Sequence, residues 1–382
     1  MEGKAWQRRE ELLRRSLPWL AGGLCCATTV LLLVFSPAAA QGAKEGLLLC
    51  AQVIVPSLFP FFVLGAIFAA LLQQQQTGGG KRRLVARGMW ALFRQPPAAL
   101  GTILLSFLGG YPMGAKSAAQ LLERGLLSRE QARRLLLFCV NAGPAYVVGV
   151  VGSSLMGSRK AGLLALLALT LSGLAIGWIS RFLAAGGNTS PLAKRPDAAQ
   201  CEKPSAANKT ASEASATASL LGAVTQATGA ILHVCAWVVL FSCLCALLRL
   251  LPQGMHGAIP SLNAILEVSS GAVQVVRTGQ GLPILCAVLG WGGLSVHCQI
   301  LGDVRKTGLA LRWFWIARLL HAALAAALCT QLLRWFPCGL PTAALQSAQS
   351  IRPWAISAPA AAAALFFCAF LILDLDLNRK IC

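Results

Sequence analysis

The stretch LGGYPMGAK, at residues 108–116, lies between two apolar segments that are each too short to cross a membrane. Pro112 lacks a backbone donor and disfavours helical backbone at Tyr111, while the neighbouring glycines permit a tight turn and close approach of other backbone. Non-helical backbone at membrane depth occurs only where protein or a water-filled cavity surrounds it. The stretch therefore predicts a broken helix or a re-entrant hairpin, an element from which transporters build substrate sites.

The composition is that of a polytopic membrane protein. Of the 382 residues, 56% are hydrophobic and only 12% are charged, and several apolar runs reach the ~20 residues that cross ~30 Å of hydrocarbon. The formal net charge of +20 comes largely from Lys and Arg between the apolar runs, which is the pattern of cytoplasmic loops. We therefore expect the lipid bilayer, and not a nucleic acid, as the surrounding partner.

The fourteen cysteines predict neither a disulfide framework nor a metal site. Most of them lie within apolar runs, where a free thiol behaves as a small hydrophobic side chain, and no pair has the CxxC spacing of zinc sites. The sequence also lacks the HExxH, GxSxG, Walker and GxGxxG motifs. We expect no enzyme activity, no cofactor and no metal, and ATP-driven transport is not encoded in this chain.

The apolar runs and the charges between them predict an all-α fold with about seven spanning helices and two re-entrant or broken-helix hairpins. The spans are expected at 17–39, which we interpret as uncleaved, and at 46–72, 135–156, 161–183, 220–250, 309–333 and 355–373. One hairpin is expected at 98–123 and a second glycine turn at 289–297. The basic run 81–94 is expected to be a cytoplasmic loop, and the span 309–333 is expected to return to the cytoplasm.

The second half of the chain repeats the pattern of the first. Residues 46–183 form the first predicted repeat with a connecting span at 161–183, and residues 218–333 form the second repeat. The polar, basic segment 184–217 between them has the composition of a disordered linker. Because the connecting span adds one crossing, the second repeat is inverted relative to the first, as in many secondary transporters. Residues 1–45 then form a basic arm with the first span, and residues 334–382 form the last span and a tail.

Glycine and polar residues within the apolar segments are the candidate substrate-binding residues. Lys116 would place a cation beside the glycine turn, although lysines near helix ends also extend toward the surface. Glu267 needs a distant basic partner, a proton or a bound cation, and Lys116 or an arginine could form a structural ion pair with it. Asn141 either caps a broken helix or contacts the solute. The full set is Gly110, Tyr111, Pro112, Gly114, Lys116, Asn141, Gly143, Pro144, Glu267 and His297.

His297 is a candidate because it lies at the end of the second glycine turn. An alignment of the two turns without gaps places His297 opposite Lys116. The alternative for His297 is a core histidine whose ring nitrogens are satisfied by neighbouring groups.

The same motifs resemble a known family. The runs GYPMGAK at 110–116 and NAGPAYVVG at 141–149, with PSLFP at 56–60 and ILEVSSG at 265–271, are similar to the nucleoside-recognition, or Gate, domain proteins. More narrowly, they are similar to the sporulation integral membrane proteins of the YlbJ type, over residues 47–333. The resemblance implies hairpins and a midplane site, as in concentrative nucleoside transporters. The narrower branch implies export of dipicolinic acid from the mother cell toward the forespore of spore-forming bacteria. The protein would then lie in a mother-cell-derived membrane.

We therefore expect a multi-pass secondary transporter or exporter of a small anionic solute. Helix N-termini at the breaks favour anions, Lys116 would add a fixed positive charge, and Glu267 could couple a proton or a sodium ion. Two alternatives stay open. One is a nucleoside or base transporter, in which Asn141 and Glu267 hydrogen-bond a neutral solute. The other is a sporulation assembly protein with the Gate fold that transports nothing, and an oligomer is compatible with each.

Overall fold

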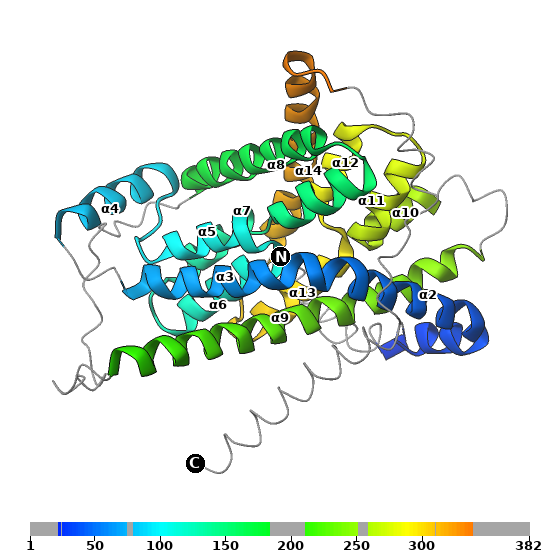
Figure 1. The fold of residues 1–382 in the computed structure, drawn as a ribbon, viewed down its shortest axis with the longest axis horizontal. Coiled ribbons are helices and arrows are strands. Elements are labelled where there is room, and N and C mark those ends of the chain that lie inside the picture. Colours follow the sequence, from blue (N-terminus) through cyan, green and yellow to red (C-terminus); the bar gives the residue numbers. More distant parts are fainter. Residues whose placement is uncertain are drawn as a thin grey trace, which may run out of the picture.

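The computed structural model describes residues 22–23, 25–74, 79–183, 211–250, 259–309 and 311–338. Every element within these ranges is a helix (Figure 1). Five helical stretches in this part of the chain are long and apolar enough to cross a membrane. The prediction of an all-α polytopic membrane protein is therefore confirmed. The predicted span at 355–373 and the greater part of the predicted linker at 184–217 lie outside the described residues.

The first long stretch is one continuous helix through residues 39–46, where a connection between two spans was predicted, and a shorter helix, Cys25–Val34, precedes it. The long stretch consists of α2 (Ser36–Leu49), the π-helix η1 (Cys50–Ile54) and α3 (Val55–Gln74). The prediction of a connection between residues 39 and 46 is wrong because the small residues there serve helix packing. A Cβ on Gly42 or Gly46 would collide with the backbone of α9 (Ala211–Leu248), and such small residues let membrane helices approach closely.

This helix is distorted at η1, which ends two residues before Pro56. A single widened turn of this kind accommodates a residue that cannot donate a backbone hydrogen bond. The Ser57 hydroxyl donates to the Val53 carbonyl in the same turn, so the distortion is hydrogen-bonded from within the helix.

The basic run predicted as a loop at 81–94 is helix α4 (Gly79–Phe93). The loop prediction is wrong because no proline interrupts this run, and Lys, Arg, Leu and Ala all favour helix. Met89 and Phe93 of α4 are buried, whereas Leu84 and Leu92 are exposed. A basic helix with one apolar face is typical of a helix that lies at the membrane surface.

The first half of the chain contains the predicted hairpin and the predicted broken span. The hairpin consists of α5 (Ala99–Gly109) and α6 (Tyr111–Glu123), which pack against each other. The broken span consists of α7 (Arg129–Phe138) and the π-helix η3 (Ala145–Leu155), and α8 (Arg159–Ser180) follows. Gly110 adopts a φ of +92° between the hairpin arms, a conformation that glycine adopts readily. Ser128 caps α7 in a capping box with Gln131.

The second half reverses direction at a different residue from the one predicted. After α9 come α10 (Ile259–Leu266), α11 (Val268–Arg277), α12 (Leu282–Trp291), α13 (Gly293–Val304) and α14 (Arg312–Trp335). α10 and α11 pack as a hairpin with Glu267 at its tip. In contrast, α12 and α13 form one spanning stretch, Leu282–Thr307. The turn predicted at 289–297 is therefore a bend within a crossing, because Gly292 and Gly293 break the helix without reversing the chain.

The direction of α14 follows from this crossing. α14 is antiparallel to α8: His321 Nε2 donates to the Leu169 carbonyl at 3.0 Å, and Lys160 donates to the Pro337 carbonyl at 2.9 Å near the other end of the pair. α14 therefore starts where α8 ends and runs back across the bundle. Because of the extra crossing by α12 and α13, α8 and α14 cross in opposite directions, and the return of 309–333 to the cytoplasm stays a prediction.

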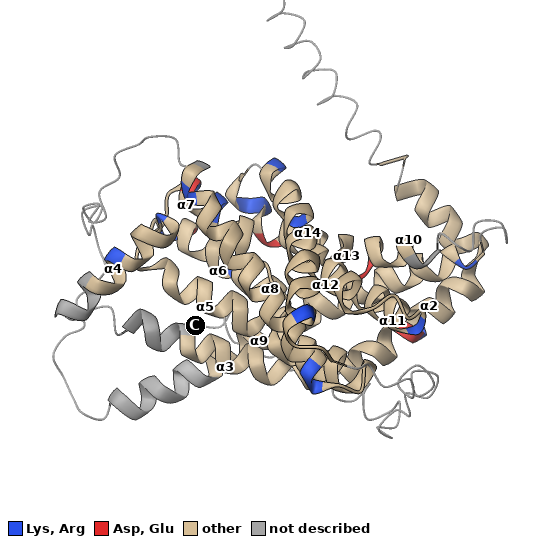
Figure 2. Ribbon diagram, turned by 90° about the horizontal axis from the view of Figure 1, so that it is seen from above, with Lys and Arg blue, Asp and Glu red and all other residues tan. Residues whose placement is uncertain are grey.

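One end of the bundle is basic. Arg134 donates to the Arg94 carbonyl and Arg181 donates to the Ala91 carbonyl, which joins α7 and the end of α8 to the end of α4. We call this region the basic end, and its arginines are Arg94, Arg133, Arg134, Arg181 and Arg312. Figure 2 shows Lys and Arg mostly at the periphery of the helices, with a largely uncharged interior. This distribution agrees with a bilayer around the middle of the bundle.

The two halves contain similar elements in the same order. Each has a long helix, then a hairpin, then a broken crossing, then another long helix. The inverted relation of the halves and the division at 46–183 and 218–333 stay predictions.

A labelling experiment tests the new course of the second half. In a cysteine-free background, Leu126→Cys, Lys306→Cys and Arg159→Cys each place one reactive thiol at an exposed position. A membrane-impermeant maleimide should reach Leu126→Cys and Lys306→Cys from the same side, since both lie at the basic end, and Arg159→Cys from the other. Labelling of Lys306→Cys together with Arg159→Cys would show that α12 and α13 form a re-entrant turn.

Candidate functional site

The four helix interruptions meet at one place in the bundle. The tip of the first hairpin touches the broken span, since a Cβ on Gly110 would lie 3.3 Å from the Gly143 nitrogen. The tip of the second hairpin touches the bend before α13, since a Cβ on Gly293 would lie 2.8 Å from the Val268 nitrogen. Glycine is needed at these contacts because the backbones themselves are adjacent.

A cavity of about 40 Å³ lies among these interruptions. This volume holds roughly three water molecules. Its polar lining comes from Tyr111, Tyr146, Glu267, Ser269, Ser295 and Gln299, and its apolar lining includes Ile54, Leu58, Val234, Val238 and Val296. Because α6, η3, α9, α11 and α13 all contribute to the lining, the two halves of the chain build the cavity together.

Glu267 is the one carboxylate in the lining of this cavity. It is completely buried and caps α11, where its oxygens accept hydrogen bonds from Ser269 N at 3.0 Å and Ser270 N at 2.6 Å. No ion pair to Glu267 exists among the described residues, so the structure does not support the predicted ion pair with Lys116 or an arginine. Backbone amides and the helix dipole replace a basic side chain.

Helix ends with free carbonyls at this centre receive donors from other segments. The Tyr111 hydroxyl, at the tip of the first hairpin, donates to the Leu289 carbonyl near the end of α12 at 2.6 Å. The Trp291 indole donates to the Ile265 carbonyl near the end of α10 at 3.1 Å. Each bond satisfies a carbonyl that lacks an intrahelical partner and also ties one interruption to the next.

Arg318 performs the same role for α7. This arginine of α14 is completely buried, donates to the Leu137 carbonyl at 3.2 Å and also donates to the Val140 carbonyl. Its guanidinium carbon lies 5.8 Å from the ring centroid of Phe314. Arg318 was not among the predicted site residues, although an arginine inside a predicted span indicates a structural or functional role.

The amide ends at the same centre are treated differently. α6, η3 and α13 begin at the cavity and have no side-chain cap, and only α11 has one, in Glu267. The helix dipole gives these ends a partial positive charge, although Met113 N at α6 and Tyr146 N and Val147 N at η3 already donate to the Gly110 and Gly143 carbonyls. The cavity therefore combines satisfied carbonyl ends with three amide ends whose partial positive charge favours an anionic group.

Five of the ten predicted site residues line the cavity. These residues are Gly110, Tyr111, Pro112, Gly143 and Glu267. Tyr146, Ser295 and Gln299 also line it and were not predicted. Each lies within eight residues of a Gly-containing interruption, and this proximity is the signal that could have found them.

Three of the other five predicted residues stabilise the interruptions. Gly114 lies against the Cys139 carbonyl with no room for a side chain. Asn141 Nδ2 donates to the Phe138 carbonyl at 2.7 Å. Asn141 therefore caps the broken helix, which is one of the two roles predicted for it. Pro144 precedes the first residue of η3.

Lys116 and His297 lie outside the cavity lining as well. Lys116 is half-buried on α6, within electrostatic reach of Asp303 on α13, which in turn is within reach of His233 on α9. His297 Nδ1 donates to the Gly293 carbonyl at 2.6 Å, and its ring stacks on Trp315 with centroids 4.6 Å apart. One ring nitrogen is therefore satisfied as in a core histidine, whereas Nε2 is buried without a hydrogen-bond partner among the described residues. His297 and Lys116, aligned without gaps, do not share a site.

Substitution of Arg318 tests whether these caps hold the fold. Arg318→Met should destabilise the protein by about 3 kcal/mol, because two buried carbonyls of the α7 end lose their donor. Arg318→Lys should recover part of this loss, since one ammonium cannot reach both carbonyls with the geometry of a guanidinium. Thermal unfolding of the purified protein in detergent measures both, with the exposed Arg312→Met at the start of the same helix as the control.

Comparison with known proteins adds one relative. The chain is 28% identical to the sporulation integral membrane protein YlbJ of Bacillus subtilis (strain 168), and the match covers 78% of each protein. No family model and no solved structure matches the chain. The sequence similarity, together with the helical membrane fold, makes the chain similar to a sporulation integral membrane protein of the YlbJ type.

Proposed function

We propose that this protein is a secondary transporter of a small anionic solute, for which dipicolinate is the first candidate. The observation that carries the proposal is the cavity at which α6, η3 and α13 present uncapped amide ends while the neighbouring carbonyl ends are capped. Transporters bind substrates at such discontinuous helices near the bilayer midplane. The membrane and sporulation assignment of the relative is compatible with dipicolinate but does not specify a solute.

We expect transport to require movement of the hairpins. The tip of the first hairpin touches the broken span, with Gly110 against Gly143, so a dicarboxylated aromatic ring that binds between them would separate this contact. The two carboxylates of dipicolinate could then contact different amide ends.

Glu267 is the residue that would couple an ion to this movement. A solute carboxylate entering the cavity would lie near the Glu267 carboxylate, and two like charges in a medium of low polarity repel strongly. A proton or a sodium ion on Glu267 removes this repulsion. The solute and the ion would therefore bind together, and this linkage is what coupled transport requires.

A nucleoside or base transporter is the second candidate. The Ser295 hydroxyl is buried and has no hydrogen-bond partner among the described residues, and Ser295, Gln299 and Glu267 all line the cavity. These groups could bind the hydroxyls or ring nitrogens of a neutral solute. A sporulation assembly protein that transports nothing, the third candidate, has no evident use for a cavity that both halves of the chain line.

Reconstitution into liposomes tests the function directly. Wild-type protein should release preloaded dipicolinate faster than protein-free liposomes and should release uridine no faster than they do. Ser295→Ala should raise the KM for dipicolinate by about tenfold through loss of one polar contact. Ser172→Ala, a buried serine bonded within α8, should leave the KM unchanged. Release of uridine but not dipicolinate supports the second candidate, and release of neither removes the transport proposal.

The role of Glu267 is tested by its pH and sodium dependence. Glu267→Gln mimics a permanently uncharged side chain, so it should retain dipicolinate binding while transport becomes independent of the proton or sodium gradient. Glu123→Gln, at the exposed end of α6, is the control and should keep the dependence of the wild type. An unaltered gradient dependence in Glu267→Gln would exclude this residue from coupling.

A further inference from the structure

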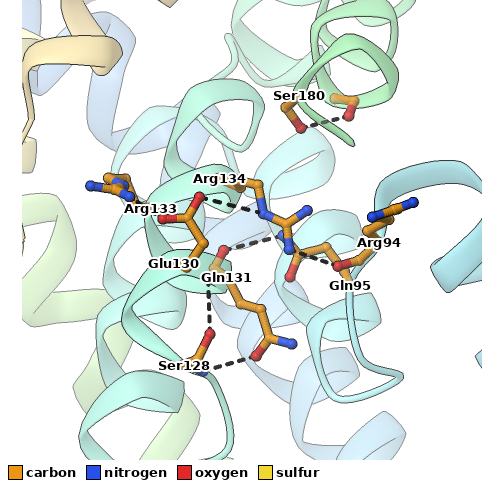
Figure 3. A network of polar contacts seen from close by, with 9 residues as sticks. Arg94, Gln95, Ser128, Glu130, Gln131, Arg133, Arg134 and Ser180 are labelled. Carbon is orange, nitrogen blue, oxygen red and sulfur yellow. Dashed lines mark hydrogen bonds and ion pairs between the residues drawn. The ribbon is translucent and has the colours of Figure 1, made fainter. Parts of the chain in front are cut away.

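A second pocket lies at the basic end of the bundle, far along α7 from the cavity. It is lined by Glu130, Arg133, Arg134, Leu137 and Trp313, and its volume is about 110 Å³. The first four residues belong to α7 and Trp313 belongs to the start of α14, so the pocket lies where these two helices run side by side. Figure 3 shows its charged side chains together with the connection between α4 and α5.

Arg134 is held rigidly in this pocket. Its side chain is only 6% exposed, Nη2 donates to the Arg94 carbonyl at 2.9 Å, and Nε lies 4.0 Å from Glu130 Oε1. Gln95 beside it is completely buried and donates to the Gln131 carbonyl at 3.1 Å, which fixes the same connection to α7. Figure 3 shows the guanidinium between Glu130 and Arg94.

The same guanidinium retains unused donors. Nη1 and Nε of Arg134 are buried and have no hydrogen-bond partner in the part of the chain that the structure describes. A buried charged group with unsatisfied donors is costly unless an acceptor reaches it. The N-terminus of α7 does not itself need a bound anion, because Ser128 and Gln131 already cap it in a capping box.

The charges in the pocket do not balance. Glu130 is the one acidic residue in the lining, and it forms an ion pair with Arg133. Two guanidinium groups then face one carboxylate, which leaves a net charge of about +1 for a further anion. Arginine pairs in this arrangement bind phosphate oxygens particularly well, because each guanidinium presents several donors in one plane.

The surroundings of the pocket are those of a bilayer surface. Trp313 is 42% exposed, and the Arg312 guanidinium lies 5.8 Å from its ring centroid. Ile316 and Leu320, which follow Trp313 at i+3 and i+7 on one face of α14, are also exposed. An amphipathic ring beside arginines, followed by an apolar outward face, is typical of a helix that passes from headgroups into hydrocarbon. We propose that this pocket binds the phosphate group of an anionic phospholipid, whose acyl chains lie along Ile316 and Leu320.

Binding can be measured on the purified full-length protein in detergent. Phosphatidylglycerol and phosphatidylcholine with identical acyl chains are titrated in, and bound lipid is counted by native mass spectrometry. One phosphatidylglycerol should bind more tightly than phosphatidylcholine. Arg133→Gln should weaken the site about tenfold, as expected for one charge-assisted contact. Glu130→Gln should strengthen it, because it removes the competing carboxylate.

A matched control separates this site from general attraction to a basic surface. Arg129→Gln removes one positive charge from an exposed position on the same helix, outside the pocket lining, and should leave the affinity unchanged. Equal losses in Arg129→Gln and Arg133→Gln would overturn the proposal. Arg134→Gln also removes the bond to the Arg94 carbonyl, so the folding of this variant must be checked. If Arg134→Gln does not fold, Arg133→Gln alone tests the proposal.

A second series of titrations identifies the source of the phosphate. Inorganic phosphate and glycerol phosphate, added at increasing concentration, should displace the bound lipid only weakly, because they lack acyl chains to contact Ile316 and Leu320. Displacement at concentrations comparable to that of the lipid would show that the pocket is a site for a soluble phosphate and would overturn the lipid assignment. None of these outcomes depends on whether the protein transports dipicolinate.

Discussion

Backbone groups at the four helix interruptions need hydrogen-bond partners that a bilayer cannot provide, and the rest of the structure depends on meeting this need. The partners come from distant segments: Tyr111 for the end of α12, Trp291 for the end of α10, and Arg318 for the end of α7. Each donor belongs to a different element from its acceptor. The hairpins, the broken crossings and α14 therefore hold one another in place, and no interruption is stable alone.

The donors and acceptors at this centre are not distributed evenly. Side chains satisfy carbonyl ends, whereas three of the four amide ends have no side-chain cap. Glu267 shows what the fourth amide end binds, namely a carboxylate held by two backbone N–H groups. The contact between the Glu267 carboxylate and these N–H groups is therefore the kind of contact that an anionic solute would make with the other amide ends. Lys116, predicted to be the partner of an anion, lies outside the cavity lining and within electrostatic reach of Asp303.

The sequence by itself determined the class of protein and the positions at which helices stop. Long apolar runs specify membrane helices because nothing else satisfies their backbone in lipid. The Gly-Gly-Tyr-Pro run at 109–112 specifies a break, and Ser128 specifies a helix start, because these effects depend on backbone chemistry within a few residues. For the same reason, the breaks at 139–143, at Glu267 and at Gly292 all fall in segments whose interruption or functional importance the sequence indicated.

Only the tertiary structure decided where the chain reverses and which side chains face the cavity. A break shows that helical hydrogen bonding stops, but the direction of the next helix depends on the helices against which it packs. This packing makes Glu267 a hairpin tip and Gly292 a bend within a crossing. Likewise, a residue near a break can face either the cavity or a neighbouring helix. Asn141 and His297 face the latter because they satisfy local carbonyls, and contacts of this kind, made after the helices pack, are not encoded in any short stretch of sequence.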